Sequence, residues 1–210
     1  MYSALLVIIY LAFISLGLPD TLLGSAWPQM HIELNASLSS AGIITMIISL
    51  GTVISSLLSD RLNIKLGTGK VTAISVLMTA VALLGFSLSH SFIILCVLAV
   101  PYGLGAGAVD AALNNYVALH YSSKHMSWLH CFWGVGASIG PYIIGTCMAH
   151  GLGWRGGYSV ISVLQFTLTA ALFITLPLWK KVENSENNVT FFHSFDPCVT
   201  FLMILLFMIG

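Results

Sequence analysis

Long apolar runs separated by short polar segments make up most of this chain. Five runs contain no Asp, Glu, Lys or Arg: residues 1–19, 34–59, 71–109, 125–154 and 156–179. A membrane-spanning helix needs about 20 predominantly apolar residues, so the run 71–109 must hold one helix, a turn and most of a second helix. The pattern predicts six spans, near residues 3–26, 38–59, 71–89, 92–118, 127–149 and 157–179. A seventh span is expected to begin near Pro197 and to stop at Gly210.

Composition places these helices in a lipid bilayer. The 210 residues are 58% hydrophobic and 7% charged, with a mean hydropathy of +0.97, whereas about a quarter of the residues in a soluble protein are charged. We therefore expect a multi-pass membrane protein rather than an enzyme. Zero net charge without a basic cluster predicts no nucleic-acid partner. The four cysteines lack CxxC spacing, so neither a metal site nor a cofactor is expected.

The basic residues predict an orientation. Six of the seven fall in the second, fourth and sixth connecting segments, and only Arg155 falls elsewhere; the six are Arg61, Lys65, Lys70, Lys124, Lys180 and Lys181. Lys and Arg accumulate in cytoplasmic loops of membrane proteins. We therefore expect a cell-membrane protein with a cytoplasmic N-terminus and cytoplasmic segments at 60–70, 119–126 and 180–196.

Two carboxylates, Asp20 and Asp110, are the only charged side chains within the long apolar stretches. Placing an aspartate at the centre of a membrane helix costs about 2.5–3.5 kcal/mol, which makes such a residue a functional-site hypothesis. Low dielectric also disfavours the charged form of a carboxylate that has no basic partner. Both residues are therefore candidate proton carriers, although Asp20 could instead cap a helix that restarts after Pro19.

Glycine and proline interrupt two of the predicted spans at matching positions. The first span contains Gly17-Leu18-Pro19-Asp20, and the fourth contains residues 101–107 (PYGLGAG) followed by Asp110. Paired interruptions of this kind are typical of inverted repeats in transporters, so the six spans divide into three and three. The glycines alone are also explained by close helix packing. On that basis we expect Gly107 and Gly140 to pack tightly and Gly69 to lie in a hydrated loop.

Three local patterns together resemble the major facilitator superfamily. They are Ser56-x-x-x-Asp60-Arg61 with Lys65, Gly67 and Lys70; the segment Gly136–Gly145, which contains Gly140 and Pro141; and Trp154-Arg155-Gly156-Gly157-Tyr158. Ser56 and Asn63 depart from the family pattern, which usually has glycine at both positions.

The resemblance implies a six-helix N-terminal bundle with a 3+3 inverted repeat (1–179), a central cytoplasmic loop (180–196) and a truncated seventh helix (197–210). It also implies a C-terminal six-helix bundle as partner, and conformational roles for Asp60, Arg61, Gly136, Gly140 and Pro141.

Within that superfamily the chain is most similar to the fucose permease group of sugar:proton symporters. The similarity rests on Asp20, on Asp110 with Asn114-Asn115-Tyr116, and on residues 130–136 (HCFWGVG); the group usually has glutamate where Asp110 stands. It implies proton coupling by Asp20 and Asp110. Sugars are bound by amides and carboxylates with aromatic platforms, which makes these residues candidate ligands: Asn114, Asn115, His130, Trp133, Gln165 and Tyr102. Interhelical hydrogen bonding is the alternative for His130 and Gln165.

The expected function is therefore proton-coupled symport of a small polar solute, with a sugar as the leading choice. One alternative is proton-driven efflux, which the segment containing Gly140 and Pro141 favours, whereas Ala99, at a position where efflux members usually carry arginine, argues against it. A truncated, non-transporting fragment is a second alternative. An intramembrane aspartyl protease would need aspartate at position 108, where the chain has Ala108.

Overall fold

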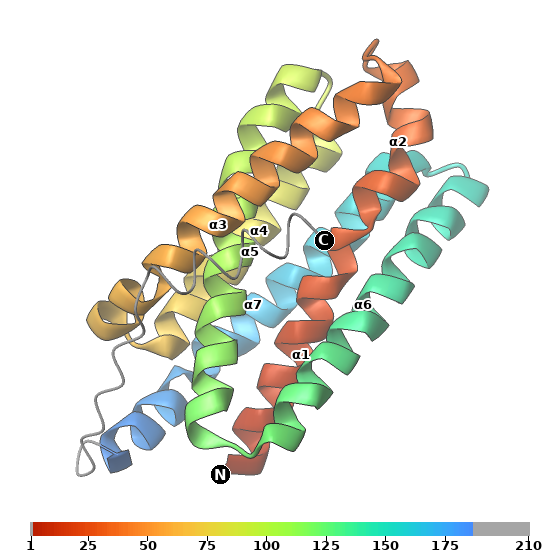
Figure 1. Cartoon of the computed structure of the whole chain (residues 1–210). Coiled ribbons are helices and arrows are strands. Elements are labelled where there is room, and N and C mark those ends of the chain that lie inside the picture. Colours follow the sequence, from red (N-terminus) through yellow and green to blue (C-terminus); the bar gives the residue numbers. More distant parts are fainter. Residues whose placement is uncertain (1, 187–210) are drawn as a thin grey trace.

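The computed structural model describes residues 2–186, with side chains placed for residues 5–179. Its regular elements are all helices, joined by short connections (Figure 1). Its elements are α1 (Tyr2–Asp20), α2 (Leu22–Glu33), the short 3₁₀ helix η1 (Leu38–Ser40), α3 (Ala41–Leu66), α4 (Thr68–Leu88), α5 (Phe92–His120), α6 (Ser123–Ala149) and α7 (Gly153–Glu186). The expected seventh span, 197–210, lies outside the described residues.

Six of the described helical stretches are long and apolar enough to cross a membrane. The first of them is α1 together with α2, which continue one another with a break at Thr21. This confirms the all-α architecture and the six predicted spans. The N-terminal span is longer than expected, because helix continues beyond residue 26 to Glu33.

The connections at the basic end are shorter than the charges suggested. Only Gly67 separates α3 from α4, so most of the expected loop 60–70 is helical. Gly67 has φ +80°, a conformation that glycine adopts without the steric penalty of a Cβ. Likewise, α7 continues through Glu186, into the segment expected to be a central loop, of which residues 187–196 are not described. Charged residues therefore mark where these helices leave the apolar region rather than where the helices end.

The main helix contacts follow an internal two-fold pattern. The most extensive pairs are α3 with α5, α4 with α7, and α1 with α6. The first three spans are α1 with α2, α3 and α4, and the last three are α5, α6 and α7. If the two sets are exchanged in order, the α1–α6 pair becomes the α5–α3 pair, and the α4–α7 pair stays the same. This pairing agrees with a 3+3 repeat in which α1 and α5 correspond, although the nearly as extensive α4–α5 contact has only a smaller counterpart in α1–α7 (Figure 1).

Glycines permit the closest of these contacts. A Cβ on Gly107 would overlap the Thr52 carbonyl oxygen and the Ser55 hydroxyl of α3, and a Cβ on Gly140 would overlap the Leu18 carbonyl oxygen of α1. Both glycines therefore pack as predicted. The expectation for Gly69 is wrong. It is buried in α4, and a Cβ there would lie 2.6 Å from Cγ of Trp179.

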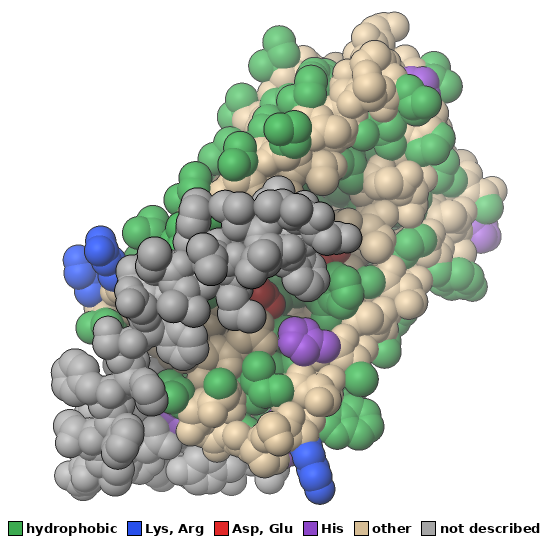
Figure 2. Space-filling model, viewed as in Figure 1, with side chains coloured by type: hydrophobic (Ala, Val, Ile, Leu, Met, Phe, Trp, Pro, Cys, Tyr) green, Lys and Arg blue, Asp and Glu red, His purple; other side chains and the backbone are tan. Residues whose placement is uncertain are grey.

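The outer surface suits lipid along most of the bundle, and its two ends differ. Figure 2 shows hydrophobic side chains spread over the molecule, and Lys and Arg side chains at the left edge and the lower tip of this view but not at its upper end. At the end where α2 meets α7, Arg155 pairs with Glu33 and donates to the Ser89 carbonyl oxygen at 3.0 Å. Trp154 donates to the same Glu33 carboxylate at 3.0 Å. This cluster ties α2, α7 and the α4–α5 connection together.

Candidate functional site

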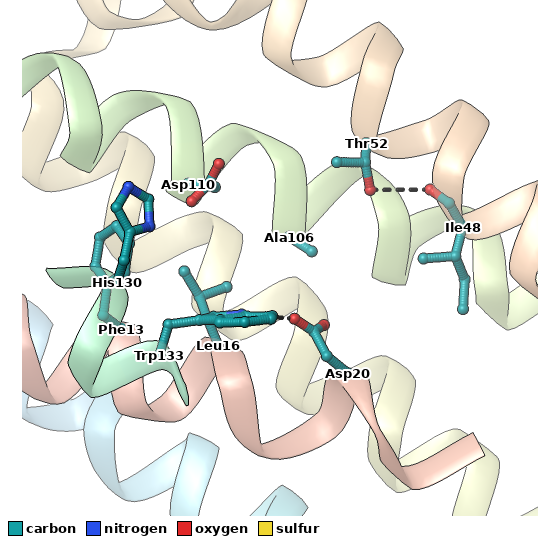
Figure 3. Close-up of a pocket in the computed structure, with 9 residues that line it drawn as sticks. All are labelled: Phe13, Leu16, Asp20, Ile48, Thr52, Ala106, Asp110, His130 and Trp133. Atoms are coloured by element: carbon teal, nitrogen blue, oxygen red, sulfur yellow. Dashed lines mark hydrogen bonds between the residues drawn. The ribbon is translucent and has the colours of Figure 1, made fainter. Parts of the chain in front are cut away.

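A cavity of about 410 Å³ lies between α1, α3, α5 and α6. Its volume falls within the range of small-molecule sites, about 300–1,000 Å³. In Figure 2 the red carboxylate atoms are recessed between the helices. Figure 3 shows the nine lining residues: Phe13, Leu16, Asp20, Ile48, Thr52, Ala106, Asp110, His130 and Trp133. Both membrane carboxylates therefore line one space.

Asp20 is the last residue of α1 and is held from two other helices. The indole N–H of Trp133 in α6 donates to Oδ2 of Asp20 at 2.8 Å, and the hydroxyl of Tyr102 in α5 donates to Oδ1 at 3.2 Å. Both donors are neutral, so they compensate the lost hydration of the carboxylate without cancelling its charge. Figure 3 shows the Trp133 ring reaching across the cavity to Asp20.

Asp110 lies on α5, as far along that helix from Phe92 as Asp20 lies along α1 from Tyr2. Asn114, one turn later on the same helix, donates to Oδ1 of Asp110 at 3.0 Å. His130 lies on the Asp110 side of the cavity, and its ring makes an edge contact with Phe13, with centroids 6.3 Å apart (Figure 3). The two acids therefore have different partners: aromatic donors for Asp20, and an amide with a nearby imidazole for Asp110.

The candidate solute ligands divide into three groups. Trp133 and His130 line the cavity. Tyr102 and Asn114 do not line it, but they donate hydrogen bonds to its carboxylates, Tyr102 to Asp20 and Asn114 to Asp110. Asn115 is exposed on α5 and is not among the residues that line the cavity.

Gln165 lies elsewhere. It is 2% exposed, and its Nε2 donates to the Ser15 carbonyl oxygen at 2.7 Å, an interhelical bond between α7 and α1. We therefore remove Gln165 from the set of solute ligands, because its amide hydrogen is directed at backbone rather than into the cavity.

Ile48 and Thr52 of α3 belong to the cavity but were not among the sequence-based candidates. The buried face of α3 is formed by Ile44, Gly51, Ser55 and Ser59, and Thr52 lies beside it, half-buried. The Thr52 hydroxyl donates to the Ile48 carbonyl oxygen at 3.0 Å (Figure 3). The available signal in the sequence was a hydroxyl residue, Thr52, directly after a glycine, Gly51.

The residues expected to act in conformational change do not line the cavity. Asp60 and Arg61 are exposed in the last turns of α3, at the basic end. Gly136 and Gly140 are buried in α6, where each faces α1 backbone, and Pro141 follows within the same helix. Among the described residues, no three His, Cys, Asp or Glu side chains are grouped as a metal site would require.

Comparison with known proteins gives distant relatives, one of which is named a transporter. The chain is 26% identical over 116 residues to an uncharacterized transporter of Sinorhizobium fredii, an alignment that covers 54% of this chain and 31% of that protein. It is 25% identical over 178 residues to synaptic vesicle glycoprotein 2B of Rattus norvegicus, covering 81% of this chain and 26% of that protein. The human glycoprotein matches at 25% over 175 residues, covering 80% and 26%. The chain thus spans less than a third of the length of these relatives.

The family comparison covers nearly the whole sequence. The model of the major facilitator superfamily matches residues 9–210. The match includes most of the first described span, the other five spans and every residue that lines the cavity, and it agrees with the main helix pairs. The resemblance to the fucose permease group has no counterpart among these comparisons, so the coarser assignment is the one they support. This chain belongs to the major facilitator superfamily, a family of membrane transporters.

Proposed function

We propose that this chain forms the N-terminal half of a proton-coupled symporter for a small polar solute, with a sugar as the leading candidate. The observation that carries the proposal is the meeting of Asp20 and Asp110 in one cavity of about 410 Å³. Membrane carboxylates are rare, and they mark proton and substrate pathways in transporters. The transporter-named relative and the family match support transport as the general activity.

The hydrogen bonds of Asp20 suggest how a proton and a solute could be linked. The ionised carboxylate accepts one bond from Trp133 and one from Tyr102. A protonated carboxyl group carries a donor on one oxygen, so it cannot accept both bonds equally well. Proton loading would therefore release one of the two donors, and a solute hydroxyl could take its place.

The cavity lining favours a neutral solute with several hydroxyl groups. Asp20, Asp110 and Thr52 offer acceptors, His130 offers a ring nitrogen, and Trp133 offers a flat apolar face. Sugars combine hydroxyl groups with apolar C–H faces, and this set of side chains matches both features. Lys and Arg are absent from the described lining, so nothing there would select an anionic solute.

Calorimetry on the purified chain in lipid nanodiscs tests both the solute and the coupling. Monosaccharides, disaccharides, amino acids and a lipophilic cation are titrated in buffers with different ionisation enthalpies, which gives the protons bound or released per solute. Symport predicts sugar binding with proton uptake, because in a symporter each ligand favours binding of the other. Proton release on binding would instead indicate antiport. Absence of sugar binding would contradict the proposal.

Matched variants locate the proton. Asp20→Asn and Asp110→Asn keep the side-chain shape and remove the titratable group. We expect at least one of them to bind sugar without proton uptake. Glu33→Gln is the control, because Glu33 is a carboxylate at the far end of α2, outside the cavity. Unchanged proton uptake in both aspartate variants would remove these residues from the coupling mechanism.

A further inference from the structure

Two prolines beside the cavity each deprive a backbone carbonyl of its helical hydrogen bond. Pro19 lies within α1 and Pro141 lies within α6. Proline has no N–H, so the carbonyl four residues earlier loses its normal donor. The affected carbonyls are those of Ser15 and Ala137. In a membrane, an unsatisfied backbone group costs several kcal/mol, so both carbonyls need another donor.

Both carbonyls receive a hydrogen bond from a side chain of another helical segment. Nε2 of Gln165 in α7 donates to the Ser15 carbonyl oxygen at 2.7 Å. Oγ1 of Thr21, at the break between α1 and α2, donates to the Ala137 carbonyl oxygen of α6 at 2.9 Å. Each carbonyl that a proline leaves without its helical donor therefore accepts a hydrogen bond from a neighbouring helical segment.

Both bonds lie next to Asp20. Thr21 directly follows Asp20, and Ser15 lies in the preceding turns of the same helix. Between them, Gly17 brings α1 against the α6 backbone, at the Trp133 carbonyl oxygen and the Ala137 nitrogen. The end of α1 is therefore fixed to α7 on one side and to α6 on the other, at the point where its last residue presents the carboxylate.

We infer that Gln165 and Thr21 are positioning residues that hold Asp20 in the cavity by capping the carbonyls that Pro19 and Pro141 leave free. The effect of this capping on transport rests on the proposed function of Asp20. The hydrogen-bond capping itself is independent of that proposal. Gln165 acts through the α1 backbone, so its position requires a hydrogen-bond donor on a side chain of the same length. Thr21 needs only its hydroxyl.

A double-mutant cycle tests the capping of Ser15. Gln165→Leu removes the donor, whereas Pro19→Ala restores a backbone N–H that can bond to the Ser15 carbonyl within α1. We expect Gln165→Leu alone to lower the folded-to-unfolded ratio in nanodiscs by about threefold or more, the average for an interhelical hydrogen bond in a membrane. In the Pro19→Ala background the same change should have little effect. A packing role for Gln165 would give equal losses in both backgrounds and would overturn the inference.

The second pair provides an independent cycle. Thr21→Val keeps the shape and removes the hydroxyl, and Pro141→Ala restores the donor to the Ala137 carbonyl. The matched control is Pro101→Ala in α5, which restores a donor to a carbonyl that neither Gln165 nor Thr21 contacts and should rescue neither variant. If Gln165→Leu does not fold, recovery of folding by Pro19→Ala supports the inference, and failure of both variants contradicts it.

A spectroscopic readout separates positioning of Asp20 from general stability. The indole N–H of Trp133 bonds to Asp20, so its proton resonance reports the placement of the carboxylate; Trp133→Phe assigns the signal. We expect Gln165→Leu and Thr21→Val to move this resonance upfield, and Pro19→Ala and Pro141→Ala respectively to restore it. An unchanged resonance would overturn the positioning role. Restored capping with normal proton coupling in Asp20→Asn would instead count against the proposed function.

Discussion

Gly17 and Gly107 occupy equivalent places in the two halves of the bundle. Each stands three residues before an aspartate, Gly17 before Asp20 and Gly107 before Asp110. Gly17 abuts the backbone of α6, and Gly107 abuts the Thr52 carbonyl of α3. The internal repeat therefore extends to individual glycine contacts. In both halves, the aspartate follows a glycine that packs closely against a neighbouring helix.

Substitutions at the packed glycines should separate seam positions from surface positions. Gly140→Ala places a Cβ against the Leu18 carbonyl, and Gly69→Ala places one against Trp179, so each should lose about 1–3 kcal/mol of stability. Gly145→Ala is the control, because nothing lies within 4 Å of its Cβ position. Thermal unfolding in detergent measures all three. Equal melting temperatures would refute the packing described here.

Trp133→Phe should weaken solute binding while keeping an aromatic ring in the cavity. The variant loses the N–H that holds Oδ2 of Asp20, and a hydrogen bond to a charged group contributes about 1.5–3 kcal/mol, or roughly tenfold or more in affinity. Trp128→Phe is the control, since Trp128 is exposed and does not line the cavity. Calorimetric titration with the sugar that binds the parent compares them; similar affinities for both variants would show that the N–H is dispensable.

Arg155→Lys should destabilise the end of the bundle where α2 meets α7. Arginine there bonds to Glu33, donates to the Ser89 carbonyl and lies 4.3 Å above the Trp154 ring. A lysine cannot make the planar set of contacts, so we expect a loss of about 1 kcal/mol despite partial exposure. The comparison is Lys124→Arg, at an exposed site at the opposite end. If both substitutions change the stability to unfolding in detergent equally, Arg155 contributes no more than an ordinary surface charge.

Cysteine labelling should establish the orientation that the basic residues predict. Ser37 lies in the connection between α2 and η1, and Ser122 lies between α5 and α6, so the two sites face opposite ends of the bundle. In a background without the native cysteines, an impermeant maleimide should label Ser37→Cys in intact cells and Ser122→Cys only after permeabilisation. The reverse pattern would place the N-terminus outside the cytoplasm.

Sequence patterns predicted the helices and the two acids well because both depend on local composition. Apolar runs of membrane length identify spans, and a charge within such a run is conspicuous, as at Asp20 and Asp110. The paired glycine and proline interruptions placed the two acids in corresponding spans, but only the fold shows that they line one cavity. The loop at 60–70 was mispredicted because charged residues continue along the helical ends of α3 and α4.

The errors in the site concern contacts between distant helices. Nothing near Gly69 in the sequence indicates that Trp179 will pack against it. The amide of Gln165 was plausible as a solute ligand until its partner, the Ser15 carbonyl, was located. That partner could be anticipated in part, since Pro19 identifies which carbonyl needs a donor. Only the fold shows which helix supplies it.

The capping of the Ser15 carbonyl also sets an order for biogenesis. α1 is synthesised first, and the residue that completes its hydrogen bonding, Gln165, is in α7, the last described span to leave the ribosome. Until that span inserts, the break near Pro19 carries an unpaired carbonyl in the bilayer. The hydrogen bonding of the first helix is therefore completed only when the sixth span arrives.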